Sequence, residues 1–281
     1  MALLSIITIN RNNAAGLQRT MQSVLEQTVD DIEYVVVDGA STDGSVDVIR
    51  QFETGFGDRL KWVSEPDAGI YNAMNKGMRM AGGDYFQILN SGDCLASDTV
   101  AERVIAELKK QDNPSILYGN MIKCFPDGRK LLDKGFAGSP VTMRGMYTGT
   151  LNHNPAFIHR SLFGKYGDYD EHLRIVSDWE WYVKAIVIGG EEPKYADINV
   201  TLFDMTGISE TNTELVKKER SLVLKQLFPK AVLADYEKYS FAIEQIDRLQ
   251  RHKAVYKLVW FIERCLFKVE KFRMKRKNRI N

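Results

Sequence analysis

Short apolar runs alternate with amphipathic segments along the first 110 residues of the chain. Between the runs, apolar side chains return every three or four residues, as at Leu17, Met21 and Val24, which predicts helices with one apolar face. The runs themselves predict buried strands over residues 5–9, 32–37, 60–63 and 85–89. Because alternating strands and helices join through right-handed crossovers, we expect an α/β fold with a mixed, mainly parallel central sheet flanked by helices.

The pattern changes after Pro114. Residues 116–124 and the segment from Lys130 flank a Pro-Asp-Gly turn, which predicts a β-hairpin. Residues 135–152 are rich in Gly, Ser, Thr and Met, which predicts a mobile loop. From about Thr213 the apolar spacing is helical. We therefore predict one domain over residues 1–210, with halves 1–112 and 113–210, and a C-terminal helical region over residues 211–281.

The composition is that of an ordinary globular protein. The chain has 281 residues, of which 44% are apolar and 27% charged. Its three cysteines show neither CxxC spacing nor a neighbouring histidine cluster, so we expect reduced thiols in a cytoplasmic protein. The apolar N-terminus lacks the basic start of a signal peptide, and we predict that it is a strand. No segment reaches the roughly 18 apolar residues of a membrane-spanning helix.

Charge is unevenly spread along the chain. Residues 252–281 carry ten Lys or Arg and two Glu, or +8, so a net charge of +1 leaves −7 on the rest. This composition is typical of a helix lying on an anionic membrane surface. The alternative is a helix that packs on the rest of the chain or on a second subunit of a homo-oligomer. No nucleic-acid-binding motif accompanies the basic residues, so no nucleic-acid partner is expected. The apolar stripe of this tail comprises Val255, Leu258, Val259, Ile262, Leu266, Val269 and Phe272.

Polar and acidic residues follow the predicted strands where these strands leave the sheet. Asn10 follows the first strand, Asp38 ends the second, and Asn90-Ser91-Gly92-Asp93 follow the fourth. Ligands of parallel α/β sheets bind at this carboxyl edge. An aspartate there can accept the N–H groups of uracil or guanine, or hold a divalent cation that neutralises a diphosphate. A strand-end aspartate also suits a turn or a helix cap, so position alone leaves both uses of Asp38 open.

Three motifs carry a resemblance to a known family. They are VVVDGASTDGS from Val35, SEPDAGIYNAMNKG followed by LNSGD between Ser64 and Asp93, and VSDWEW from Val176. Over about residues 3–210 they resemble family 2 glycosyltransferases of the GT-A, Rossmann-like fold. The second motif is similar to the bacterial exopolysaccharide branch that includes colanic-acid fucosyltransferase-like enzymes. The two predicted halves would then be the nucleotide-sugar side and the acceptor side.

The resemblance implies a reaction and a place for it. The reaction is inverting transfer of a sugar from a UDP- or GDP-sugar to a hydroxyl of a lipid-linked glycan acceptor, in bacterial surface-polysaccharide synthesis. The protein would work in the cytoplasm, peripherally on the inner face of the membrane.

The resemblance also assigns roles to residues by their place in the motifs. Asp178 is the catalytic base that takes the proton of the acceptor hydroxyl. Asp93, with His153, holds Mn²⁺ or Mg²⁺. We expect Asp38, Asp93 and Asp178 to face one crevice. The nucleotide and sugar are bound by Thr8, Asn10, Asp38, Asp67, Asn75, Lys76, Asn90 and Ser91, with Tyr71 and Asn72 directed toward the sugar.

Each of these residue types also has an ordinary structural use. Asp178 can cap the helix that follows it, His153 can be a structural hydrogen-bonding residue, and Lys76 can be solvated. Trp179 and Trp181 suit either sugar stacking or core packing.

Two rival functions remain open from the sequence. Asn90, Gly92 and Ser177 stand where family members often carry acids, which suits a non-catalytic sugar-nucleotide-binding protein. A nucleotidyltransferase would also bind its nucleotide at a parallel sheet. It would carry a Gly-rich, basic loop after the first strand, and residues 10–14 match that pattern poorly.

Overall fold

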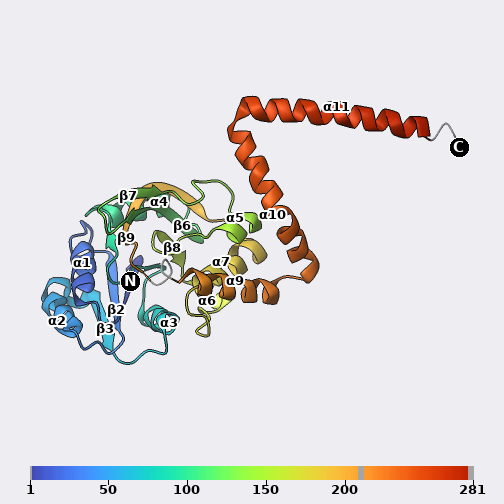
Figure 1. Cartoon of the computed structure of the whole chain (residues 1–281). Coiled ribbons are helices and arrows are strands. Elements are labelled where there is room, and N and C mark those ends of the chain that lie inside the picture. Colours follow the sequence, from blue (N-terminus) through green and yellow to red (C-terminus); the bar gives the residue numbers. More distant parts are fainter. Residues whose placement is uncertain (1, 208–211, 278–281) are drawn as a thin grey trace. The chain divides into compact units, whose positions relative to one another are not determined.

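The computed structural model describes residues 2–207 and 212–277, whose helices and strands are labelled in Figure 1. The predicted domain boundary at residue 210 and the last four residues of the basic tail lie outside the described residues. The chain divides into two compact units, Met1–Ser221 and Leu222–Asn281, which are described separately below. All candidate site residues belong to the first unit.

One sheet forms the centre of the first unit, in the order β3-β2-β1-β4-β8-β6-β9-β5, with β7 paired to β6. The first four strands are parallel where they pair, β8 runs antiparallel to β4 and β6, and β6 and β9 are parallel. The predicted mixed, mainly parallel sheet is therefore confirmed. The strands are β1 (Leu4–Asn10), β2 (Ile32–Asp38), β3 (Leu60–Ser64), β4 (Tyr85–Ile88), β5 (Cys94–Leu95), β6 (Ile116–Cys124), β7 (Lys130–Asp133), β8 (Ala156–His159) and β9 (Lys194–Asp204).

Helices cover both faces of this sheet because its strands are apolar on both sides. On one face, α1 (Ala14–Leu25), α2 (Ser45–Phe56) and α4 (Val100–Lys110) bury their apolar stripes against side chains such as Ile6 of β1. On the other face, α3 (Ile70–Met80) packs on β1 and β2. Gly77 of α3 lies against Ile7 and Val37, so the helix and the sheet approach closely at this point.

The parallel register brings polar strand ends to one edge of the sheet. Asn10 of β1 pairs with Asp38 of β2, and Asp38 pairs with Ser64 of β3. The β4 strand lies on the other side of β1, and Asn90 follows it directly. Sequence segments far apart in the chain therefore supply polar groups to the same edge, as the sequence predicted.

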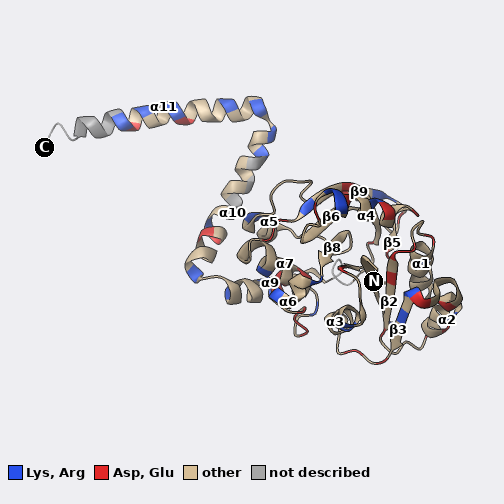
Figure 2. Ribbon diagram, turned by 180° about the vertical axis from the view of Figure 1, so that it is seen from behind, with Lys and Arg blue, Asp and Glu red and all other residues tan. Residues whose placement is uncertain are grey.

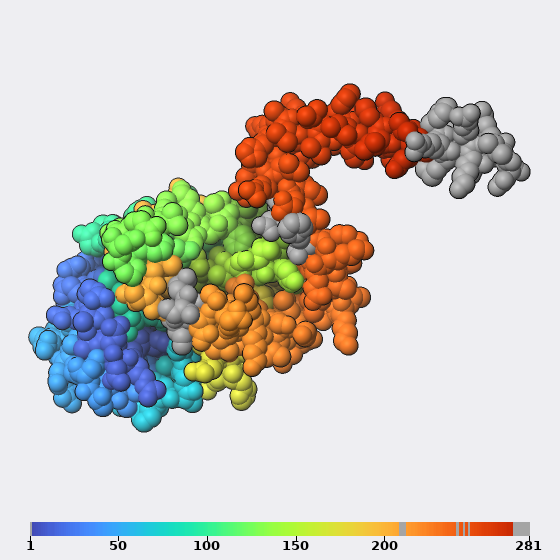
Figure 3. Space-filling view, viewed as in Figure 1, coloured from blue at the N-terminus to red at the C-terminus, as the bar shows by residue number. Residues whose placement is uncertain are grey.

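The second half of this unit shows two features that the sequence pattern did not specify. The loop expected over residues 135–152 contains a helix, α5 (Met143–Thr148), whose N-cap Thr142 accepts a hydrogen bond from Gly145 N. The helix after Val176 has two parts, α7 (Ser177–Tyr182) and the π-helix η2 (Val183–Ile188). Figure 3 shows the segment around residues 125–150, in green, on the same face of the molecule as α1. The remaining elements are η1 (Gly57–Arg59), α6 (Ser161–Tyr166) and α9 (Thr213–Leu227).

The second unit is helical. The predicted amphipathic run breaks at His252 into α10 (Lys230–Arg251) and α11 (Lys253–Lys277). The apolar stripe of α11 is exposed from Val255 to Val269; the side chain of Phe272 lies outside the described part of the chain. No helix of the described residues is long and apolar enough to cross a membrane.

Candidate active site

Two adjoining cavities open at the carboxyl edge of the sheet. The first, which we call the strand-end cavity, has a volume of about 420 Å³ and is lined by residues such as Asn10, Asp67 and Ser91. The second, which we call the inner cavity, has a volume of about 300 Å³ and is lined by Asp178 among others. Ile70 and Asn90 line both cavities, so the two meet at the end of β4.

Asp178 occupies the first turn of α7 and faces the inner cavity. Its Oδ2 lies 2.9 Å from His153 Nδ1, and its Oδ1 lies 2.8 Å from the hydroxyl of Tyr71. Burial acts to raise the pKa of Asp178, but the hydrogen bond and charge of His153, together with Tyr71, outweigh it and lower the pKa. A carboxylate held ionised next to a cavity can accept a proton from a ligand bound there.

Tyr71 connects α3 to the loop that precedes α7. Its hydroxyl lies 2.5 Å from the carbonyl oxygen of Ile175 and 2.8 Å from Asp178 Oδ1. Since a phenol has one proton, it can donate to only one of these two acceptors at a time. Burial and the neighbouring carboxylate both raise the pKa of Tyr71, which keeps this proton on the hydroxyl.

His153 lies between Asp178 and Asn90. Burial acts to lower the pKa of His153, but the hydrogen bond and charge of Asp178, with the charge of Asp93, raise it overall. The other ring nitrogen, Nε2, lies 3.3 Å from Asn90 Nδ2. Asn90 Oδ1 is buried and has no hydrogen-bond partner among the described residues. Because Nδ1 contacts Asp178 and Nε2 contacts the Asn90 amide nitrogen, the Asn90 oxygen is the atom of this pair that lacks a partner among the described residues.

Asp93 does not line the inner cavity itself but contacts Asn154, which does. Its Oδ2 accepts a hydrogen bond from Asn154 Nδ2, at 2.5 Å, and its Oδ1 accepts one from Asp204 N, at 2.9 Å. Only 3% of the residue is exposed, and burial raises its pKa to about 7. In the part of the chain that the structure describes, no group of three or more His, Cys, Asp or Glu side chains could hold a metal ion.

Asp38 is buried at the end of β2 and holds side chains next to the strand-end cavity through hydrogen bonds. Both carboxylate oxygens accept two hydrogen bonds each, from Asn10 Nδ2, Ser41 Oγ, Ser41 N and Ser64 Oγ, over 2.5–2.9 Å. Burial acts to raise the pKa of Asp38, but these donors, led by Ser41, lower it. Asp38 thus orients Asn10, which lines the cavity, and its own contact with a nucleotide base stays a prediction.

Comparison with known proteins gives three findings. A family model described as Glycosyl transferase family 2 matches residues 5–164. The chain is similar to a PGL/p-HBAD biosynthesis glycosyltransferase of Mycobacterium tuberculosis, with 29% identity over 218 residues that cover 77% of this chain and 82% of that protein. The third finding is a likeness to two solved structures.

The structure is similar to S. aureus TarS 1–349 in complex with UDP, with a TM-score of 0.64, 18% identity, and coverage of 86% of this chain and 72% of that one. It is also similar to the mannosyltransferase PcManGT from Pyrobaculum calidifontis in complex with GDP-Man and Mn²⁺. In that comparison the TM-score is 0.56 and the identity 19%, with coverage of 72% of this chain and 56% of that one.

The chain belongs to glycosyl transferase family 2. It is a glycosyltransferase, and the predicted GT-A fold is confirmed. Membership of this family favours sugar transfer over the nucleotidyltransferase alternative.

The predicted site residues of this glycosyltransferase fall into two groups. Those in the first group line a cavity: Asn10, Asp67, Asn90 and Ser91 the strand-end cavity, and Asn90, His153 and Asp178 the inner cavity. Those in the second group lie behind the walls of both cavities, and comprise Thr8, Asp38, Asn75, Lys76 and Asp93. Of the three aspartates expected to face one crevice, only Asp178 lines one of these two cavities, because neighbouring hydrogen-bond donors hold the other two.

Several residues of the second group have a structural partner that explains their position. Thr8 donates a hydrogen bond to the carbonyl of Leu89 within the core. Asn75 is buried and binds the backbone of Tyr169. Lys76 pairs with Asp67, at 2.6 Å, which holds the acid that lines the strand-end cavity.

The glycosyltransferase site also has residues that sequence reasoning missed, on α9. The Glu219 carboxylate accepts hydrogen bonds from the backbone N–H groups of residues 174–176, at 2.9–3.3 Å, and so fixes the loop that leads to Asp178. Arg220 lines the inner cavity. The sequence does contain a signal for these two residues. Glu219 and Arg220 are charged but lie on the apolar side of a helix, between Val216 and Val223.

The two tryptophans of VSDWEW pack in the core. Trp179 Nε1 donates to the carbonyl of Met146, and Trp181 Nε1 to the carbonyl of Gly167. Both side chains are almost fully buried, so core packing is the use that the structure favours, and Trp179 also lines the inner cavity.

Proposed function

We propose that this glycosyltransferase inverts the anomeric centre of a nucleoside-diphosphate sugar as it transfers that sugar to a hydroxyl of a lipid-linked glycan. The proposal rests mainly on Asp178, an ionised carboxylate at the wall of a cavity that adjoins a second, strand-end cavity. Two adjoining cavities suit two substrates. The motifs similar to the colanic-acid fucosyltransferase-like branch support a role in surface-polysaccharide synthesis.

The donor nucleotide would lie in the strand-end cavity, with its diphosphate toward Asn90. Asn10, Asp67 and Ser91 offer polar groups to a UDP- or GDP-sugar there. The solved structures of similar fold hold UDP in one case and GDP-Man in the other, which supports a nucleoside diphosphate as the ligand class.

The acceptor hydroxyl would lie against Asp178 in the inner cavity. As its oxygen forms a bond to the anomeric carbon, its proton passes to the Asp178 carboxylate and the bond from that carbon to the diphosphate breaks. The electron pair of the broken bond leaves with the diphosphate. One base on the side opposite the leaving group is what an inverting displacement needs. Holding both substrates in line supplies much of the acceleration.

Tyr71 can serve Asp178 before and after proton transfer. While Asp178 is ionised, the Tyr71 hydroxyl can donate to Oδ1. Once Asp178 carries the proton, the carboxyl group can donate to the Tyr71 oxygen, and Tyr71 can donate to the carbonyl of Ile175 instead. Both protonation states of the base would then have a hydrogen-bond partner, so neither leaves a buried polar group unpaired.

A divalent cation would bind beside Asn90 together with the diphosphate. The Asn90 oxygen lacks a partner among the described residues, the charge of Asp93 acts on His153, and His153 has one ring nitrogen that Asp178 does not hold. We propose that Asp93 and His153 hold Mn²⁺ or Mg²⁺ with a diphosphate, whose charge the cation would neutralise. Since these residues supply few ligands, metal affinity should depend on bound nucleotide.

We further propose that the protein works at the inner face of the cytoplasmic membrane through α11, where a lipid-linked acceptor would be at hand. The helix carries a basic side and an exposed apolar stripe, the combination that binds anionic lipid. Figure 2 shows the Lys and Arg residues, in blue, along α11.

The variant Asp178→Asn tests the proposed reaction. Because asparagine cannot take the proton, transfer and donor hydrolysis should fall by about 10²- to 10⁴-fold. Asp178→Asn should still bind UDP or GDP, as measured by calorimetry in the presence of Mn²⁺. Asp168→Asn, at an exposed aspartate paired with Arg79, is the matched control and should keep full activity. Unchanged turnover in Asp178→Asn would show that another group is the base. A wild-type protein that binds nucleotide sugars and never turns them over would be a non-catalytic binder.

A further inference from the structure

Arg220 is a cation of the inner cavity that forms no ion pair within the part of the chain that the structure describes. It extends from α9 into the cavity wall, and its guanidinium carbon lies 4.8 Å from the ring centre of Trp179. Its buried Nε has no hydrogen-bond partner among the described residues. Burial lowers the pKa of Arg220, and the charge of Asp178 acts to raise it. A partly buried guanidinium that forms no ion pair among the described residues has lost solvation that no such pair restores.

The charged side chains that line the inner cavity are mostly basic. Within the described residues, its wall includes Lys123, Arg174 and Arg220, against one carboxylate, Asp178. Lys123 pairs with Asp133 outside that wall, at 2.8 Å, so its charge is offset. The remaining excess of positive charge favours an anionic group on whatever enters.

The fold holds Arg220 at this place. The preceding residue, Glu219, binds three backbone N–H groups of the loop that leads into α7. This clamp sets α9 against the segment that carries Asp178. Arg220 therefore stands at a fixed position beside the candidate base, where an apolar side chain could have packed on Trp179 equally well.

We propose that Arg220 binds a phosphate group of the acceptor, and that the enzyme thereby selects acceptors whose reacting hydroxyl lies near a phosphate or diphosphate. This inference rests on the proposed function. The base must meet the acceptor in the inner cavity, while the donor nucleotide has the strand-end cavity and its diphosphate lies at Asn90, where the two cavities meet. We therefore assign an anion bound at Arg220 to the acceptor. A guanidinium suits this role because its planar fork matches two phosphate oxygens.

Binding measurements on two variants and a control test the proposal. Arg220→Met keeps a long side chain over Trp179 and removes the charge, Arg220→Lys keeps the charge without the fork, and Lys218→Gln removes an exposed charge from the same helix. The acceptor probes are a sugar 1-phosphate and the methyl glycoside of the same sugar. The donor probes are UDP and GDP, each compared with its monophosphate. Thermal unfolding of every variant checks that it is folded.

The wild type should bind the sugar 1-phosphate more tightly than the methyl glycoside. Arg220→Met should weaken binding of the sugar 1-phosphate by about 10- to 100-fold, the usual effect of losing a hydrogen bond to a charged group. Arg220→Lys should fall between Arg220→Met and the wild type. Affinity for the methyl glycoside, UDP and GDP should stay within about twofold, and Lys218→Gln should match the wild type throughout.

Three results would overturn the proposal. Loss of affinity for UDP or GDP, but not for the sugar 1-phosphate, in Arg220→Met would assign the guanidinium to the donor. Arg220→Met could instead match Lys218→Gln with every probe, or the wild type could fail to distinguish the sugar 1-phosphate from the methyl glycoside. Hydrolysis of the donor by the wild type separates these results from failure of the proposed function. If the proposed function is wrong, the wild type hydrolyses no donor, whatever the binding data. If only the role of Arg220 is wrong, the wild type still hydrolyses the donor.

Discussion

Two buried carboxyl groups near the same histidine show how local surroundings set their chemistry. Asp178 receives hydrogen bonds from His153 and Tyr71, and these outweigh burial and lower its pKa. Asp93 receives hydrogen bonds from Asn154 and from Asp204 N, but burial dominates and raises its pKa to about 7. Near neutral pH the first is an ionised proton acceptor, whereas the second is partly protonated until a cation or another positive charge approaches.

The raised pKa of Asp93 makes the protein less stable as pH rises. The pKa of Asp93 is about 7 in the folded state and has its ordinary value of 3.8 in the unfolded state. At a pH between these two values, the folded state binds a proton that the unfolded state has lost. The free energy of unfolding of the wild type should therefore fall between about pH 4 and pH 7, and Asp93→Asn should be free of this fall. With 1.36 kcal/mol for each pKa unit, the variant should gain up to about 4 kcal/mol relative to the wild type.

Urea unfolding at pH 4.5, 6 and 8, in the presence of a chelator, measures this difference. Asp168→Asn, at an exposed carboxylate, provides the control and should show no comparable trend. A difference between Asp93→Asn and the wild type that stays constant from pH 4.5 to 8 would contradict the raised pKa.

At the scale of elements, close packing of α3 on the sheet places Tyr71 in reach of Asp178. The helix contacts β1 and β2 through Gly77, where a side chain would overlap Ile7. Tyr71, six residues earlier on the same helix, then reaches the loop before α7. The position of a helix on a sheet thus decides whether the candidate base has its hydroxyl partner.

Gly77→Ala separates helix propensity from packing. Propensity alone predicts that alanine stabilises a helix by about 1 kcal/mol relative to glycine. Because the new methyl group would overlap Ile7 Cγ2 and approach Val37 Cγ2, we expect the opposite, a loss of about 1–3 kcal/mol in the free energy of unfolding. Gly164→Ala in α6 is the matched control, since nothing lies within 4 Å of its added methyl group, and it should be neutral or stabilising. Urea unfolding measures the change in the free energy of unfolding for each variant. Equal changes for Gly77→Ala and Gly164→Ala would rule out a tight contact between position 77 and Ile7.

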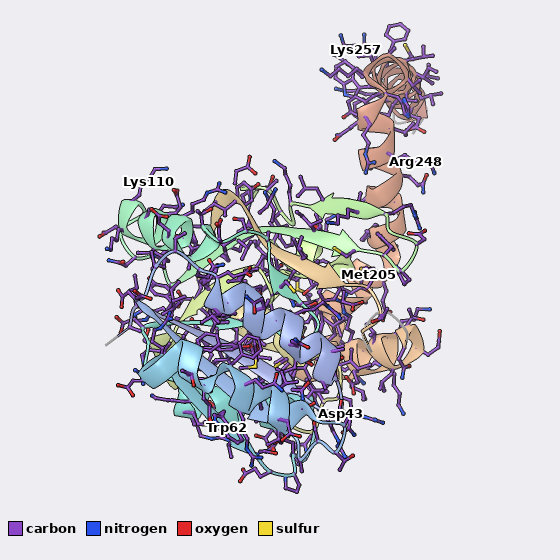
Figure 4. All side chains as sticks on the ribbon, turned by 90° about the vertical axis from the view of Figure 1, so that its left-hand side faces the viewer. Asp43, Trp62, Lys110, Met205, Arg248 and Lys257 are labelled. Carbon is purple, nitrogen blue, oxygen red and sulfur yellow. The ribbon has the colours of Figure 1, made fainter. Side chains whose placement is uncertain are left out.

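At the scale of the whole molecule, charge is divided between an acidic main part of the chain and a basic C-terminal helix. Helical spacing places Lys257, Arg264 and Lys268 of α11 on one side and Val259 and Ile262 on the opposite side. The apolar side chains of this helix are exposed, about half or more in most cases. Figure 4 looks nearly along α11, with Lys257 labelled, and shows side chains radiating on all sides.

Anionic vesicles should bind the full-length protein through α11. We expect co-sedimentation with phosphatidylglycerol vesicles, little with phosphatidylcholine, and loss of binding at high salt. Replacing Lys257 and Lys268 by glutamine should weaken binding by about 10- to 100-fold, at about 1 kcal/mol for each basic residue. The same change at Lys109 and Lys110 of α4 alters the net charge equally and should have little effect. A protein that ignores these vesicles and self-associates through α11 in sedimentation experiments would instead show that a second copy covers the apolar stripe.

Much of this protein was determined by the sequence alone. Apolar runs and helical stripes predicted the α/β fold, because a strand or helix shows its buried faces in the spacing of its own residues. Three motifs identified the family, and strand-end residues such as Asn10, Asn90 and Ser91 were correctly expected at one edge of the sheet. Those conclusions depend on local patterns and on the parallel register that such patterns require.

Only the tertiary structure decided which groups meet. It paired His153 with Asp178, and it placed Asp38 and Asp93 behind the cavity walls. It also brought Arg220 into the inner cavity from a helix about 40 residues beyond Asp178 in the sequence. Such contacts depend on how distant segments pack, and burial and hydrogen bonding after packing set the pKa of each acid. A residue's identity and its neighbours in sequence carry no record of these surroundings.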